Sequence, residues 1–322
     1  FVATYNKLKS RRYGMKKSRK NKAEPVLEQE RSVTMKTFHT VAFQYGPGGG
    51  NPCPVTLEAD GLTGEQMQQM TFQFQQEAAF LLSPTAPGCD VKPRYFVPLH
   101  EMEMCVHATV ASAMVLVDQG IIQHSPIVFE SHYGPLPVEW ERKDGEILIR
   151  VEQFLPKFQA KRPSDEELCR VLGIPQEALG KGPVESAATS RMKLMVPLAA
   201  PHWVHEVKPD FPALWDLCDR CETTGFYIFA PENNRPDNVV FHARQFPNRS
   251  GYNEDPATGV AASALGAYLV RHQLIPVAEG WNPCTVYQGE AMGRPSLIRA
   301  ETQVTGGKIT KTRICGTACY EK

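Results

Sequence analysis

The sequence lacks the features that would place this chain of 322 residues in a membrane, in a secreted scaffold or on a nucleotide. No apolar run approaches the roughly 20 residues that a membrane-spanning helix requires. No apolar leader of the secretory kind is seen, so we expect a cytoplasmic protein whose nine cysteines are free thiols. The glycine-rich stretch 46–52 forms neither GxGxxG nor a Gly-Lys-Ser/Thr loop and is interpreted as a turn.

Net charge is also lacking, because 35 Lys and Arg balance 35 Asp and Glu. The distribution is uneven. Residues 1–34 carry ten Lys or Arg and three Glu, a net charge of +7 that leaves −7 on the remainder. A body of net charge −7 argues against nucleic-acid binding. A strand signal starts at Met35, so residues 1–34 are interpreted as a basic tail, disordered or derived from a vector.

Metal-ligand patterns are weak as well. Cys218 and Cys221 have the CxxC spacing but fall within a predicted helix, with further cysteines only near the C-terminus. A structural zinc ion needs four ligands in a tetrahedral arrangement, so the pair is interpreted as core cysteines. His202 and His205 flank a strand-like run without an acidic or cysteine companion cluster, and we interpret them as structural or surface residues. The sequence therefore predicts no metal site.

What the chain does contain is a similar passage twice, about half its length apart. Segments 63–85 and 210–232 each read as an amphipathic helix followed by an apolar strand, and 107–120 resembles 259–272 around a shared Ala-Ser-Ala. Two unrelated segments of similar periodicity are the alternative, but the shared order favours a repeat. We therefore predict half-domains over 35–180 and 181–322, with a ligand site in the cleft between them.

Three residues carry the strongest chemical signal. Glu77 lies between the first amphipathic helix and its strand, where apolar neighbours would raise the carboxyl pKa and suit it to acid–base work. Its counterpart in the repeat is Thr224. His107 and Asp255 each open a helix of small residues, whose free N–H groups favour a bound carboxylate. Taken singly, Glu77 would be a solvated carboxylate at a helix end, His107 a hydrogen-bonded imidazole in the core, and Asp255 a helix cap.

Together with further matches, these residues resemble the PhzF family, phenazine-biosynthesis-like isomerases with the diaminopimelate-epimerase fold. The resemblance spans residues 36 to about 319. Besides Glu77, the matching motifs lie at 50–52, 59–62, 94–96, 105–109, 254–259, 288–289, 293–296 and 306–307. It implies an α+β fold of two pseudo-symmetric half-domains, each a curled, mostly antiparallel sheet around a central helix, with the active site in the cleft between them.

The resemblance also implies the residues of the site. Glu77, His107 and Asp255 would be catalytic. Substrate contacts would come from Asn51, Cys105, Val106, Ala108, Thr258, Gly259 and Val260. The family pattern has Gly where Val106 stands and Ser where Val260 stands, so we expect both valines to border the pocket and to restrict the acids that fit.

The preferred function is a cofactor-independent isomerase that shifts a proton on a small carboxylic acid, with Glu77 as general acid and base. One alternative is an amino-acid or hydroxy-acid racemase or epimerase, in which Cys105 works opposite Asp255 or Glu77. A second alternative is a non-catalytic ligand-binding or scaffold homologue. We expect a homodimer that binds its small acid without a cofactor, a nucleic acid or a membrane.

Overall fold

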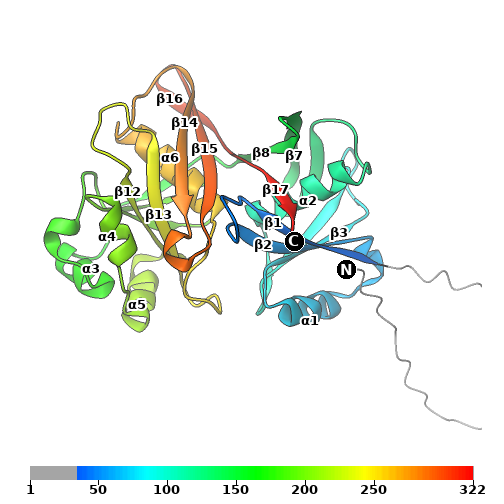
Figure 1. The fold of residues 1–322 in the computed structure, drawn as a ribbon, viewed down its shortest axis with the longest axis horizontal. Helices are drawn as coiled ribbons and strands as arrows, with labels where there is room; N and C mark the ends of the chain where they lie inside the picture. Colours follow the sequence, from blue (N-terminus) through cyan, green and yellow to red (C-terminus); the bar gives the residue numbers. More distant parts are fainter. Residues whose placement is uncertain (1–34, 322) are drawn as a thin grey trace, which may run out of the picture.

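The computed structural model describes residues 35–321 and consists of two lobes that lie side by side (Figure 1). The predicted basic tail, 1–34, lies outside the described residues. Each lobe is a curled sheet around one buried helix, α2 (Val106–Asp118) in the first and α6 (Gly259–Arg271) in the second. Most strand pairs are antiparallel, so the predicted α+β fold with two similar halves is confirmed.

The remaining elements follow in chain order. Up to residue 153 they are β1 (Lys36–Ala42), β2 (Asn51–Leu57), η1 (Ala59–Gly61), α1 (Gly64–Phe74), β3 (Ala78–Leu82), β4 (Lys92–Phe96), β5 (Glu101–Met102), β6 (Ile127–Ser131), β7 (Gly134–Lys143) and β8 (Glu146–Gln153). The later ones are β9 (Lys157–Gln159), α3 (Asp165–Leu172), η2 (Gln176–Ala178), β10 (Glu185–Ala188), β11 (Lys193–Pro197), α4 (Pro201–Glu206), α5 (Phe211–Cys221), β12 (Gly225–Pro231), β13 (Val240–Pro247), β14 (Gly280–Gln288), η3 (Glu290–Met292), β15 (Ser296–Thr305), β16 (Lys308–Gly316) and β17 (Ala318–Tyr320).

The internal repeat extends to the strand pairing. In the first lobe β1–β2 is antiparallel, β2–β3 parallel and β3–β4 antiparallel, and the second lobe repeats this with β10–β11, β11–β12 and β12–β13. A parallel bridge between Val91 and Phe129 continues the first series towards β6, as the parallel pair β13–β14 does in the second. An antiparallel meander completes each series of strands, β6–β8 in the first lobe and β14–β16 in the second.

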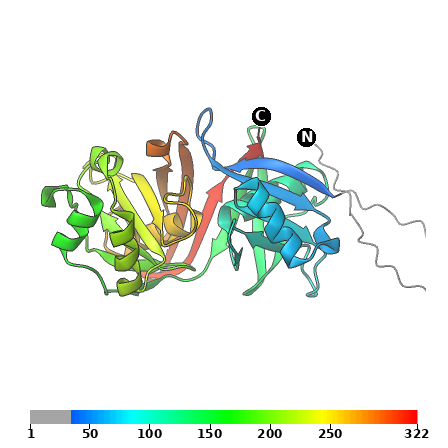
Figure 2. The same ribbon diagram turned by 90° about the horizontal axis from the view of Figure 1, so that it is seen from below.

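Each lobe is completed by a strand that follows the meander of the other. β9 comes directly after β8 but pairs with β10, and β17 comes directly after β16 but pairs with β1. Figure 2 shows the C-terminal strands, in red, running from one lobe to the other. β8 and β16 pair with each other and join the lobes. By strand pairing, the second half therefore starts at β9, earlier than the predicted division between residues 180 and 181.

The two amphipathic helices form where the sequence predicts them. α1 starts with a capping box in which Thr63 and Gln66 satisfy each other's backbone N–H groups, and Asp210 caps α5. Met67 on α1 and the CxxC cysteines on α5 are buried in the core. None of the helices within residues 35–321 is long and apolar enough to cross a membrane.

The strand-like interpretation of the segment around His202 and His205 is wrong. These residues lie in α4, whose first residue is Pro201. Proline fixes a helical φ and lacks the N–H group that a strand would use, so it starts a helix readily. The histidines are exposed, as predicted for surface residues, but His205 has acidic company that the sequence did not reveal.

The central helices abut end to end at the interface of the lobes. Both are 13 residues long, with N-caps at Cys105 and Thr258, so Val106 corresponds to Gly259. The sequence alignment of the repeat had paired His107 with Gly259 and was one residue out of register at this point. A Cβ atom on Gly259 would lie 2.6 Å from Cγ1 of Val106, so the glycine is required by the valine that it faces.

The close contact between Gly259 and Val106 leads to a prediction about stability. Gly259→Ala should lower the free energy of unfolding by about 1–3 kcal/mol, because the added methyl overpacks against Val106. Val106→Ala in the same chain should recover part of that loss. Urea denaturation measures both changes. Gly61→Ala is the control, since a Cβ there meets nothing within 4 Å. Equal stability of Gly259→Ala and wild type would show that the helix ends are not tightly packed.

Candidate active site

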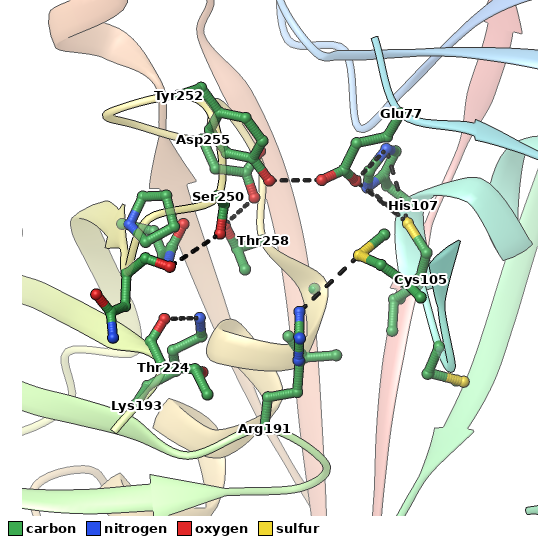
Figure 3. Close-up of a pocket in the computed structure, with 18 of the residues that line it drawn as sticks. Glu77, Cys105, His107, Arg191, Lys193, Thr224, Ser250, Tyr252, Asp255 and Thr258 are labelled. Atoms are coloured by element: carbon green, nitrogen blue, oxygen red, sulfur yellow. Dashed lines mark hydrogen bonds and ion pairs between the residues drawn. The ribbon is translucent and has the colours of Figure 1, made fainter. Parts of the chain in front are cut away.

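A cavity of about 180 Å³ opens between the lobes, at the N-terminal ends of α2 and α6 (Figure 3). Both lobes contribute to its walls. Eight of the residues singled out in the sequence line it. They are Glu77, Cys105, Val106 and His107 from the first lobe and Asp255, Thr258, Gly259 and Val260 from the second. The two valines thus border the cavity, as the departures from the family pattern predict.

Glu77 lies between α1 and β3, and its side chain is 12% exposed. Its Oε1 accepts a hydrogen bond of 2.5 Å from the hydroxyl of Tyr252, which belongs to the opposite lobe. Its Oε2 lies 3.3 Å from Nε2 of His107 and 3.4 Å from Sγ of Cys105. Burial raises the pKa of the Glu77 carboxyl, although the hydrogen bonds from Tyr252 and Cys105 counteract the rise.

His107 is held as a neutral imidazole. Burial lowers its pKa to about 4, and the charge of Asp255 offsets only part of this effect. The sulfur of Cys105 at 3.3 Å and the amide nitrogen of Asn51 at 3.5 Å face Nδ1. Nε2 of the ring faces the carboxyl of Glu77. Burial also raises the pKa of Cys105, which keeps the thiol protonated.

Asp255 is buried in a network that crosses the interface. Its Oδ1 accepts a 2.7 Å hydrogen bond from Nδ2 of Asn51, and its Oδ2 accepts a 2.5 Å bond from the hydroxyl of Thr258. Asn51 also donates to the carbonyl of Ala257 at 3.0 Å. Burial, together with the charge of Glu77, raises the pKa of Asp255 to about 6. His107 and Asp255 thus share Asn51 as a partner, although 148 residues separate them.

Both helix N-termini at the cavity are uncapped. Neither Cys105 at α2 nor Thr258 at α6 makes a side-chain hydrogen bond to the first turn. The free N–H groups and the positive ends of the two helix dipoles therefore favour a negatively charged ligand. Ala108 is fully buried in α2 and does not line the cavity, and Asn51 acts through His107 and Asp255 without lining it.

Sequence reasoning missed several residues that line the cavity or support its walls. Tyr252 lies three residues before Asp255, but nothing in the sequence shows that its hydroxyl reaches Glu77. Gln288 donates to the Asp255 carbonyl at 2.7 Å and to the Thr258 hydroxyl at 2.9 Å. Its only sequence signal was its place in a family motif. The cavity wall opposite Glu77 adds Arg191, Lys193 and Gln245, which had no sequence signal, and Thr224, which the repeat had paired with Glu77.

Within residues 35–321, two groups of side chains could hold a cation. Glu77, Cys105 and His107 place one ligand atom each within 4.8 Å of one another, and so do His205, His242 and Glu290. The second group corrects the prediction that His205 lacks an acidic companion. In the first group, burial favours the neutral thiol, whereas a metal ligand must be a thiolate. Burial of the thiol therefore opposes metal binding by the first group.

The chain matches a known family along most of its length. The profile of the PhzC-PhzF family, described as phenazine biosynthesis-like protein, matches residues 40–322. An uncharacterized isomerase of Deinococcus radiodurans is 31% identical over 304 residues, which cover 93% of this chain and 97% of the relative. The trans-2,3-dihydro-3-hydroxyanthranilate isomerase of Pseudomonas aeruginosa is 30% identical over 289 residues, which cover 85% and 93%.

A solved structure agrees with these sequence matches. The PhzF-family phenazine biosynthesis protein of Bacillus anthracis superposes with a TM-score of 0.80 at 27% identity, over 89% of this chain and 96% of that one. The family match, the isomerase relatives and the shared architecture agree with the resemblance found in the sequence. The chain belongs to the PhzC-PhzF family of phenazine biosynthesis-like proteins and is a PhzF-like isomerase.

Proposed function

We propose that this isomerase moves a proton between two carbon atoms of a small carboxylic acid, without a cofactor, and that Glu77 carries the proton. The observation that supports this most is the place of Glu77: a buried carboxyl of raised pKa, beside two uncapped helix N-termini in one cavity. A carboxyl whose pKa lies nearer neutrality both accepts and returns a proton efficiently.

The reaction begins with a C–H group next to a carboxylate or a conjugated system. The Glu77 carboxylate takes the proton, and the electron pair that is left behind delocalises over the conjugated system. The protonated Glu77 then returns the same proton to another carbon, and the double bond moves. The free N–H groups at the starts of α2 and α6 stabilise the negative charge that develops on the substrate, as an oxyanion hole does.

His107 and Asp255 hold the substrate in this arrangement. Nε2 of the neutral His107 ring lies 3.3 Å from Oε2 of Glu77, and its low pKa of about 4 keeps the ring from competing with Glu77 for the proton. Asp255 lies across the cavity and accepts hydrogen bonds from Asn51 and Thr258, which fix its orientation. Its carboxyl, whose pKa is about 6, is available to a polar group of the substrate.

The first prediction concerns Glu77 itself. Glu77→Gln should keep the fold but reduce turnover by roughly 10²–10⁴-fold, because the amide has a similar volume and no basicity. The measurement is solvent-deuterium incorporation, followed by NMR, across a panel of small unsaturated carboxylic acids. Glu65→Gln, on the exposed side of α1, is the matched control. Wild-type rates in Glu77→Gln would remove this residue from the mechanism.

The second prediction concerns pH. The carboxylate form of Glu77 starts the reaction, so kcat/KM should fall as the pH falls through its pKa. Burial should place the midpoint of that fall above 4.5, the value of an unperturbed glutamate. Glu77 and Asp255 raise each other's pKa, so Asp255→Asn should move the midpoint to lower pH even though the rate drops. A midpoint that Asp255→Asn leaves in place would contradict the coupling.

The third prediction separates the isomerase from the racemase alternative, which the 3.4 Å contact between Cys105 and Glu77 keeps relevant. Cys105→Ser should retain most of the activity, because the buried thiol is protonated and is not the proton carrier. The position equivalent to Cys105 in the second lobe is Thr258, so the second lobe has no thiol at the matching position. Loss of turnover in a folded Cys105→Ser variant, with inversion of a chiral acid by wild type, would favour racemisation.

A further inference from the structure

The wall of the cavity opposite Glu77 holds a buried lysine without an acidic partner. Lys193 is the first residue of β11 and is 5% exposed. Its Nζ donates one hydrogen bond, 3.2 Å long, to the carbonyl of Thr224. Within residues 35–321 no carboxylate oxygen lies within ion-pair distance of this ammonium group. A buried ammonium group with one neutral partner is costly, since it can donate three hydrogen bonds and has lost its hydration.

Arg191 places a second positive charge beside Lys193. Its Nη1 reaches across the interface to Sδ of Met102 at 3.9 Å, a weak contact, and it too forms no ion pair within the described chain. Other arginines nearby are compensated. Arg244 binds both carboxylate oxygens of Glu254 at 2.8 Å, and Arg249, on the same cavity, pairs with Asp219 at 2.6 Å. Among the Lys and Arg side chains that line the cavity, Arg249 is therefore paired with a carboxylate of the described chain, whereas Lys193 and Arg191 are not.

Neither cation serves as the partner of Glu77. Their charges lower its pKa less than the hydrogen bonds from Tyr252 and Cys105 do. Burial and the charge of Arg191 lower the pKa of Lys193 to about 8, so the two cations destabilise each other. A third donor lies on the same wall, because Nε2 of Gln245 is buried without a hydrogen-bond partner. Three uncompensated donor groups thus line one side of the cavity.

We propose that Lys193 and Arg191 bind a second carboxylate of the substrate, so that the enzyme acts on small dicarboxylic acids. This inference rests on the proposed function, which assigns the first carboxylate to the N-termini of α2 and α6. Figure 3 shows Arg191 and Lys193 on one side of the cavity and Glu77 with His107 on the other. A ligand with an acidic group at each end satisfies both sides and holds the carbon atoms between them next to Glu77.

A binding experiment tests this without requiring turnover. Isothermal titration calorimetry compares glutarate with valerate, two acids of equal chain length with two carboxylates and one. Wild type should bind glutarate more tightly. Lys193→Met should weaken glutarate binding by about 10- to 100-fold, the loss expected for one hydrogen bond to a charged group, while valerate binding stays the same. Arg191→Gln, at an exposed position that tolerates substitution, should act in the same direction.

Lys208→Met, which removes an exposed lysine of the same lobe, is the control and should leave both affinities unchanged. Wild type that binds glutarate no more tightly than valerate would overturn the proposal. So would an equal loss for both acids in Lys193→Met and Arg191→Gln, since the cations would then hold the single carboxylate. If glutarate is preferred but no acid exchanges deuterium, the proposed isomerisation fails while the second carboxylate site stands.

Discussion

The hydrogen bonds of Asn51 across the lobe interface hold the site together. Its amide nitrogen donates to Oδ1 of Asp255 and to the carbonyl of Ala257, and it also faces the ring of His107. Asn51 is the first residue of β2 in one lobe, whereas both acceptors belong to the loop before α6 in the other. Because the amide group is buried, these bonds fix the distance between the two helix N-termini and thus the width of the cavity.

Burial at the interface of the lobes influences the charge state of the groups around the cavity. Burial raises the pKa values of Glu77 and Asp255 and lowers those of His107 and Lys193. All four shifts have the same origin, since loss of hydration disfavours the charged form of any group. Sites that perform acid–base chemistry at neutral pH need such shifts, and here the contact of the two lobes produces them.

The two halves keep the same topology but have diverged at positions that line the cavity. Glu77 of the first half corresponds to Thr224 of the second, and the N-cap Cys105 corresponds to Thr258. Thr224 lines the same cavity, where its carbonyl accepts the hydrogen bond of Lys193. Thr258 binds Asp255 through its hydroxyl. A pseudo-symmetric fold therefore surrounds an asymmetric site, which suits a reaction with a single proton carrier better than one with two opposed bases.

The sequence by itself determined the repeat, the four principal helices and the family, because periodicity, caps and motifs are local properties of the chain. Through the family resemblance, the sequence also predicted that Glu77, His107 and Asp255 belong to one site. Only the tertiary structure decided that β9 and β17 change lobes, that Val106 faces Gly259, and that Lys193 lies buried without an acidic partner. These features depend on contacts between residues far apart in sequence. Such contacts follow from the path of the chain and from packing, and no local pattern of residue types records them.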